Sequence, residues 1–275
     1  FYGGEPFINF EAIKKTVEYV NTIDNNIEVY ITTNATILTN EVIEWFSTNK
    51  NIHLFVSIAG IPIRHDELRI FSNLQPTFDT IKNNLINLKK YDYESYINRV
   101  RFVFNIFDEI QLIELQEFWE QDDIFKETVH LPEITFIDCI DDDGTINKLR
   151  KNVIGKYSKE INPLKKYIDL ITQKNFNNII VKHYDEKLLR VHKRLINSSE
   201  NILSGICRPF INKMFIDING NINLCENFKY ELKLGNVYDG FSIDSVEELL
   251  TLYKNNRSKT CINCWATKLC SLCFR

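Results

Sequence analysis

The stretch Ile27–Gly60, IEVYITTNATILTNEVIEWFSTNKNIHLFVSIAG, contains two apolar runs separated by a helical pattern. Ile27–Thr32 is short and rich in β-branched residues, which predicts a buried strand. Thr39 can cap a helix that runs through Phe46. Ile52–Ile58 is rich in Val, Ile and Phe and predicts a second strand. Strands that alternate with helices indicate a parallel sheet covered by helices.

The same alternation continues on both sides of this stretch. Phe1-Tyr2 can end a strand, and Glu11–Ile23 has the apolar spacing of a helix. Downstream, Thr77 opens a helix with Ile81, Leu85 and Leu88 on one face. Further elements are predicted as a strand at Val100–Ile106, a helix at Ile110–Trp119 and a strand at His130–Ile137. The count suits an incomplete barrel better than a sandwich, so we expect an α/β chain with a partial parallel (β/α)6 TIM-like barrel.

The sequence changes character after the barrel region. Asn162–Asn197 is helical and polar-faced, which is typical of a connector. Asn219-Gly220 lies between two alternating apolar runs and predicts a β-hairpin, and Ser245–Tyr253 predicts a helix. We therefore expect three parts, which are the partial barrel at 1–140, a helical connector at 141–205 and a small α+β cysteine-rich domain at 206–275.

Bulk composition excludes two classes of partner. The 275 residues carry 33 basic and 37 acidic side chains, a net charge of −4, with no basic stripe of the kind that binds nucleic acid. No apolar run approaches the length that crosses a bilayer, so no membrane partner is expected. The chain begins at Phe1 and stops at Arg275, and we expect both ends to be cut.

The cysteines are strongly clustered. Of seven, Cys139 lies in an apolar segment and is expected to be an inert core thiol. Thiols gathered beside a large core are typical of metal ligands in a reducing, cytoplasmic compartment. Six thiolates exceed the four that zinc takes and suit two cubane iron–sulfur clusters. The alternative is one zinc knuckle built from the last four cysteines alone. The six clustered cysteines are Cys207, Cys225, Cys261, Cys264, Cys270 and Cys273.

Polar residues follow three predicted strands. They are Gly3-Gly4-Glu5-Pro6, Thr32-Thr33-Asn34, and Ser57-x-Ala59-Gly60, the last followed by His65-Asp66-x-x-Arg69. Ligands of parallel α/β folds gather at the carboxyl ends of strands, so the three groups together predict one pocket. Taken singly, each also fits an ordinary loop. His65 and Asp66 allow an acid–base interpretation, but a solvated loop or helix start is favoured, because no partner at catalytic spacing is evident.

The same segments resemble motifs of radical S-adenosylmethionine (SAM) enzymes. FYGGEPF at 1–7 resembles their GGEP segment, which binds the SAM amino group. Thr33-Asn34 resembles their TNG strand end, with Ala35 replacing Gly, and VSIAG at 56–60 resembles S-[IL]-D-G, with Ala59 replacing Asp. His65-Asp66-x-x-Arg69 resembles H-D-x-x-R. The resemblance implies that SAM is bound by Gly3, Gly4, Glu5, Thr33, Asn34, Ser57, Arg69 and Asn105, with Ser57 and Arg69 meeting its ribose or carboxylate.

The tail resembles the SPASM extension, which holds auxiliary iron–sulfur clusters in enzymes that modify peptides and proteins. Gly220-x4-Cys225 fits its pattern, whereas Cys270-x2-Cys273 is one residue shorter than usual. By analogy the first auxiliary cluster is held by Cys207, Cys225 and Cys273, and the second by Cys261, Cys264 and Cys270.

The resemblance implies a radical SAM oxidoreductase that acts on peptides. The radical SAM [4Fe-4S] cluster of that family is held by C-x3-C-x2-C upstream of GGEP, a motif that this sequence lacks, so those ligands are expected outside the chain. One or two auxiliary [4Fe-4S] clusters are expected within it. Such an enzyme makes a 5′-deoxyadenosyl radical, and the first expectation is thioether or carbon–carbon crosslinking of a ribosomally made peptide. An electron donor such as ferredoxin or flavodoxin is implied as a partner.

Two alternatives remain open at this stage. The first is an anaerobic sulfatase-maturating enzyme, in which an Asp after the G-x4-C cysteine acts as a base. Here that position is Glu226, the candidate base, although a surface acid is the favoured interpretation. The second is a zinc-stabilised α/β binding protein without catalysis.

Overall fold

The computed structural model describes residues 1–137, 162–192, 214–225 and 233–260. The chain divides into two compact units, Phe1–Glu186 and Lys187–Arg275. Within the described residues, no helix combines the length and apolarity needed to span a membrane.

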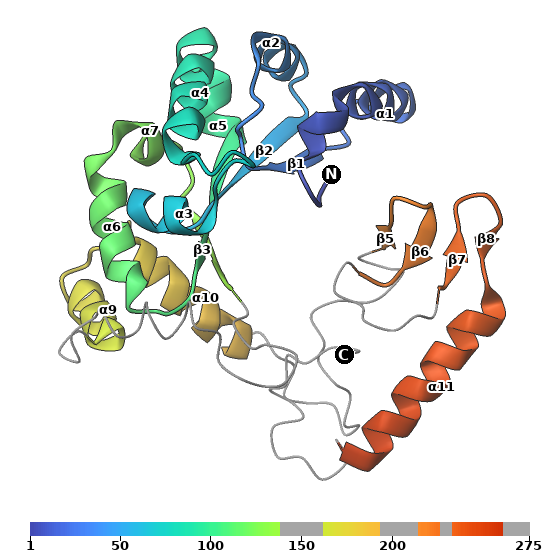
Figure 1. Cartoon of the computed structure of the whole chain (residues 1–275). Coiled ribbons are helices and arrows are strands. Elements are labelled where there is room, and N and C mark those ends of the chain that lie inside the picture. The colour runs from blue at the N-terminus through green and yellow to red at the C-terminus, as the bar shows by residue number, and fades with distance from the viewer. Residues whose placement is uncertain (138–161, 193–213, 226–232, 261–275) are drawn as a thin grey trace. The chain divides into compact units, whose positions relative to one another are not determined.

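The first unit is built on a parallel sheet of four strands in the order β1-β2-β3-β4 (Figure 1). The strands are β1 (Val29–Thr33), β2 (Ile52–Ile58), β3 (Val100–Ile106) and β4 (Glu133–Phe136). Phe1 extends this pattern beyond β1, because its carbonyl accepts a hydrogen bond from the Thr32 amide at 3.0 Å and its nitrogen donates to the Tyr30 carbonyl.

Helices connect the strands, as a parallel sheet requires. Before β1 come the 3-10 helix η1 (Pro6–Asn9) and α1 (Phe10–Ile23), and α2 (Asn40–Thr48) joins β1 to β2. The β2–β3 crossover holds α3 (Pro62–Leu68), α4 (Phe78–Tyr91) and α5 (Tyr93–Arg99). The β3–β4 crossover holds α6 (Gln111–Gln121) and α7 (Asp123–Lys126), and α9 (Pro163–Thr172) and α10 (Ile179–His192) follow β4.

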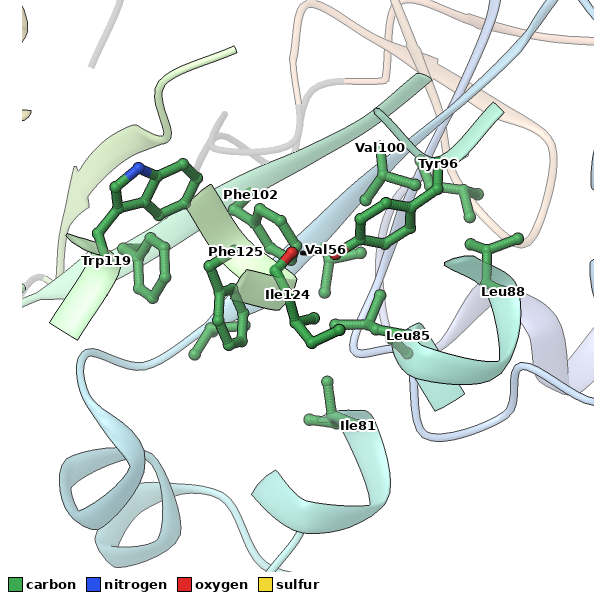
Figure 2. Packing of buried hydrophobic residues seen from close by; sticks show 14 of the residues in the cluster. Val56, Ile81, Leu85, Leu88, Tyr96, Val100, Phe102, Trp119, Ile124 and Phe125 are labelled. Atoms are coloured by element: carbon green, nitrogen blue, oxygen red, sulfur yellow. Dashed lines mark hydrogen bonds between the residues drawn. The ribbon is translucent and has the colours of Figure 1, made fainter. Parts of the chain in front are cut away.

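The two faces of the sheet differ in burial. In β2 and β3 every second residue is fully buried under the helices, and these residues form the core with helix side chains such as Leu85 and Phe125 (Figure 2). Tyr96 is buried in this core and donates its hydroxyl hydrogen bond to the Ile124 carbonyl. The alternate residues are only half-buried. We call their side the second face, and it carries Tyr30, Thr32, His53, Phe55, Ser57, Arg101, Val103 and Asn105.

The second unit holds an antiparallel sheet in the order β5-β6-β7-β8. Its strands are short: β5 (Phe215–Ile216), β6 (Asn221–Asn223), β7 (Gly235–Asn236) and β8 (Gly240–Phe241), followed by α11 (Ile243–Thr260). A small cluster of Leu224, Leu234 and Leu249, with Val246 against it, packs the sheet onto the helix.

The predicted fold class is confirmed, with four parallel strands described where six strand–helix units were expected. A parallel α/β sheet is followed by a small α+β unit, and the strands at 52–58 and 100–106 have the predicted bounds. Thr39 caps α2 through the Val42 amide at 3.3 Å. The hairpin also forms, but Asn219-Gly220 closes a four-residue turn from Asp217, with Gly220 at φ +76°.

Candidate functional site

A cavity of about 720 Å³ opens at the carboxyl ends of β1 and β2. Six of the eight residues predicted to bind SAM line it: Gly3, Gly4, Thr33, Asn34, Ser57 and Arg69. The other two, Glu5 and Asn105, instead hydrogen-bond to lining residues. The structure thus brings the three predicted strand ends together at one pocket.

The Gly3-Gly4 turn needs glycine for its backbone. The φ angles are +99° and +45°, in the region that side chains with a Cβ disfavour. A Cβ built on either residue meets no atom within 4 Å. Both glycines line the cavity, and without side chains their backbone can approach a ligand closely.

Glu5 fastens this turn to the end of β1. Its Oε1 accepts the Thr33 hydroxyl at 2.7 Å and the Phe7 amide at 3.2 Å, and its Oε2 accepts the Asn34 amide at 2.7 Å. As the residue before η1, Glu5 also caps that helix. These contacts fix the carboxylate, whose remaining lone pairs can still accept from a ligand ammonium.

Ser57 is held from two sides at the end of β2. Its Oγ accepts from Arg69 Nη2 at 3.0 Å and from Asn105 Nδ2 at 2.8 Å. Asn105 is oriented in turn by the Thr135 hydroxyl, which donates to its Oδ1. Since a hydroxyl has one hydrogen and both of these contacts use its lone pairs, the Ser57 hydrogen points to no acceptor among the described residues and is available to a ligand.

Arg69 also donates from Nη1 to the Ser57 carbonyl at 2.9 Å. Its side chain is partly buried, which lowers the pKa of the guanidinium, although it stays charged at neutral pH. No carboxylate pairs with it among the described residues. The remaining N–H groups can therefore bind an anionic or hydroxyl-bearing ligand in the cavity.

His65 lies in α3 and is fully buried, so the alternative of a solvated loop for this residue is wrong. Its Nδ1 accepts the Ala59 amide at 3.1 Å, and its Nε2 lies 2.9 Å from the Thr77 hydroxyl. That hydroxyl donates to the Arg69 carbonyl at 2.9 Å, so Nε2 must carry the hydrogen. Burial lowers the pKa of His65 to about 4. The residue is a neutral structural link and not an acid–base catalyst.

Asp66 completes this link. Its Oδ1 accepts the amides of Thr77 and Phe78 at 3.0 and 2.9 Å and so caps α4. The segment 69–77 is thereby fixed at both ends, with Ile70 and Pro76 paired across it. The H-D-x-x-R motif closes a loop against the cavity wall. We call this the α3–α4 clasp, residues 65–77.

Ala35, which stands where the resembled TNG motif has glycine, has φ +58° and is fully buried. Asn34 stabilises this left-handed turn, because its Oδ1 accepts the Thr36 amide at 2.9 Å and the Thr36 hydroxyl at 2.7 Å. The strained turn places the Asn34 backbone at the cavity.

Several lining residues were not predicted from the sequence. Tyr2 precedes the glycine pair, and Leu68 and Phe71 flank Arg69, so adjacency to the motifs was the available signal. Thr77 and Ile81 come from the start of α4, which the clasp brings to the wall.

The predicted cluster ligands cannot be placed in the same way. Cys225 lies two residues after β6, is half-buried and forms no disulfide with a described residue. Cys139, Cys207, the four tail cysteines and Glu226 lie outside the described residues. Within the described part, no three metal-binding side chains come together.

Comparisons with known proteins bear on the fold of the chain. No family model matches the chain. It is 41% identical over 97 residues to the uncharacterized protein MJ0907 of Methanocaldococcus jannaschii, a match that spans 34% of this chain and 32% of that protein. Native anSMEcpe with bound AdoMet and Kp18Cys peptide matches 98% of the chain at a TM-score of 0.60 and 18% identity, and the match covers 73% of that protein.

Two further anSMEcpe structures match similarly. The complex with AdoMet and Cp18Cys peptide has a TM-score of 0.59, and the complex with AdoMet alone 0.58, each at 18% identity, over 98% of this chain and 73% and 72% of theirs. The protein anSMEcpe is a radical SAM enzyme with a SPASM domain. The present chain therefore has the fold of a radical SAM enzyme with a SPASM domain.

Proposed function

We propose that the chain is the SAM-binding and auxiliary-cluster portion of a radical SAM/SPASM peptide maturase. The observation that carries this proposal is the cavity at the carboxyl ends of β1 and β2, which is lined by the Gly3-Gly4 turn and by the hydrogen-bonded Ser57–Arg69 pair. The fold is that of proteins whose structures contain bound AdoMet.

The residues present fit SAM. A ligand with an amino acid end and a ribose needs an acceptor for ammonium, donors for carboxylate and a hydroxyl partner. Glu5 and the backbone of the glycine turn supply the acceptor for the ammonium group. Arg69 supplies the donors for the carboxylate, and Ser57 supplies the hydroxyl partner for the ribose. Asn105 orients Ser57, Thr33 and Asn34 position the Glu5 carboxylate, and the cavity volume suits a small-molecule site.

The cysteines of the second unit suit iron–sulfur clusters by their number and spacing. Bound SAM and its cluster would supply the radical that abstracts hydrogen from a peptide, and electrons would come from a cytoplasmic donor such as ferredoxin or flavodoxin. The chain's own contribution is to bind, orient and shield the nucleotide. The favoured reaction is a thioether or carbon–carbon crosslink in a ribosomally made peptide.

Ligand-observed NMR with SAM tests the proposed site, because it detects weak binding. Ser57→Ala and Arg69→Lys should each weaken SAM binding about ten-fold, since each removes a hydrogen bond worth on the order of 1 kcal/mol or more. Ser47→Ala is the matched control, because the buried Ser47 hydroxyl has no partner and lies outside the cavity. Equal SAM binding by all four proteins, or none by the wild type, would refute the assignment.

Anaerobic sulfatase maturation is the second candidate, favoured by the structural likeness to anSMEcpe. It predicts a carboxylate base at Glu226. In an enzyme that also carries the C-x3-C-x2-C cluster, Glu226→Gln should then abolish conversion of a cysteine- or serine-containing sulfatase peptide while leaving SAM cleavage intact. A crosslinking enzyme should leave that peptide unchanged with either form.

A further inference from the structure

Arg101 is the one described arginine of the first unit without an acceptor. Arg64 pairs with Glu67, Arg69 binds Ser57, and Arg99 binds backbone carbonyls. Arg101 forms no hydrogen bond or ion pair with any described residue, and its Nε is buried and unpartnered. A half-buried guanidinium without an acceptor is costly unless an anion reaches it.

The described surroundings of Arg101 offer it no carboxylate partner. Arg101 lies opposite Phe55 in the sheet register, with its guanidinium carbon 5.7 Å from that ring. His53 occupies the neighbouring position of the second face, and its Nδ1 is also buried without a partner. Glu28 is already engaged, since it accepts the Tyr30 hydroxyl and lies 3.8 Å from His53.

The charge of Arg101 acts on two histidines. Burial, and then the charge of Arg101 among others, lowers the pKa values of both His53 and His130. Arg99 also lowers the first and Lys182 the second, while Glu28 and Glu133 act in the opposite direction. No described carboxylate neutralises Arg101 itself.

Arg101 lies on the same face of β3 as Asn105, which contacts a residue of the cavity. Arg101, Val103 and Asn105 share one face of β3, and Asn105 orients the cavity residue Ser57. Arg101 lies four residues before Asn105, which is about 13 Å along the strand at 3.3 Å per residue. An extended peptide covers that distance in about four residues.

We propose that Arg101, beside His53 on the second face, binds a carboxylate of the substrate peptide. The inference rests on the proposed function, because it takes the ligand to be the peptide. It specifies an acidic group about four residues from the residue that is modified, supplied either by an acidic side chain or by the peptide's C-terminus.

Histidine ring NMR of the full chain at constant ionic strength tests this site. The probes are N-acetylaspartate N-methylamide, which carries a side-chain carboxylate, and N-acetylglycine, which carries a C-terminal one. Either should raise the pKa of His53 and His130, because an anion on Arg101 offsets its charge, and the more effective probe identifies the source. Neutral N-acetylglycinamide should move neither.

Arg101→Gln should abolish the carboxylate response, whereas Arg64→Gln, the matched control, should keep it. Arg101→Lys should keep the charge but bind several-fold more weakly. An unchanged response in Arg101→Gln, a response to the neutral amide, or no response in the wild type would overturn the proposal. If Arg101→Gln does not fold, the wild-type comparison of charged and neutral probes decides.

The SAM titration of the same samples is read separately. A carboxylate response without SAM binding would support the Arg101 site and refute the maturase assignment. SAM binding without a carboxylate response would support the maturase assignment and refute the Arg101 site.

Discussion

Arg99, at the end of α5, holds the amino ends of the strands together. It donates to the carbonyls of Asn49, Ile52 and Phe46 at 2.8–3.0 Å, and its guanidinium lies 4.1 Å from the Phe46 ring centroid. Arg99→Met leaves these buried acceptors unpaired, so it should lower the free energy of unfolding by about 3 kcal/mol. Urea denaturation measures the loss. Arg101→Met is the matched control, and a similar loss there would contradict the contrast between the two arginines.

His65 predicts an acid-sensitive fold. Its pKa is about 4 in the folded chain because of burial, against about 6.5 when unfolded. The unfolded chain therefore binds the extra proton between these values, and stability falls as the pH drops from about 6.5 to 4, by on the order of 3 kcal/mol. Unfolding at a series of pH values should show a shallower slope for His65→Asn. A ring that titrates near 6.5 in NMR would disprove this account.

At the residue scale, the sequence indicated the site because its motifs follow strand ends, and strand ends in a parallel sheet meet. Gly3, Ser57 and Arg69 were found in this way. The role of His65 was missed, because its partner Thr77 lies twelve residues away and no local pattern links them. The lack of a described acceptor for Arg101 was missed as well, because it depends on which residues the folded sheet places around its side chain.

At the element scale, the strands with strict alternation were predicted best. β2 and β3 have the expected bounds because one face is fully buried and selects every second residue. β4 is shorter than the expected His130–Ile137, since only Glu133–Phe136 pairs with β3. The short helices α5 and α7 were not predicted, because seven and four residues are too few to establish a helical period.

The α3–α4 clasp can be tested as an element. Asp66 accepts two amides at the start of α4, and Thr77 makes no side-chain cap there. Asp66→Ala should lower the free energy of unfolding by about 1–2 kcal/mol and also weaken SAM binding, because the clasp carries Arg69. Asp79→Ala, in the first turn of the same helix and without a hydrogen bond, should change both by far less. If Asp66→Ala bound SAM with full affinity, the α3–α4 clasp would not be needed to position Arg69 for SAM binding.

The second unit depends on one close backbone approach. Gly235 in β7 has φ +152°, and a Cβ there would lie 2.2 Å from the Gly240 carbonyl oxygen. Gly240 has φ +79° but open space around it. Gly235→Ala should therefore separate β7 from β8 and lower the iron content of the purified chain, whereas Gly240→Ala should cost only about 1 kcal/mol of backbone strain. Limited proteolysis and iron analysis compare the two variants. Equal protease resistance and equal iron content would mean that the β7–β8 contact is dispensable.

At the scale of the whole molecule, the two units differ in what holds them together. The first has an extensive apolar core, whereas the apolar cluster described in the second is Leu224, Leu234 and Leu249. A cluster of this size stabilises a unit only weakly, so under the proposed function the six clustered cysteines supply a further constraint by binding metal.

Metal analysis under anaerobic conditions should therefore find iron and acid-labile sulfide, about eight iron atoms per chain if both auxiliary clusters are present. Removing iron with a chelator should unfold the second unit and leave the thermal transition of the first nearly unchanged, because the core of the first contains no metal ligand among the described residues. Cys225→Ser should lower the iron content without affecting that transition. One colourless zinc ion per chain, with no sulfide, would instead assign the cysteines to a zinc knuckle and leave the cavity of the first unit as a binding site without radical chemistry.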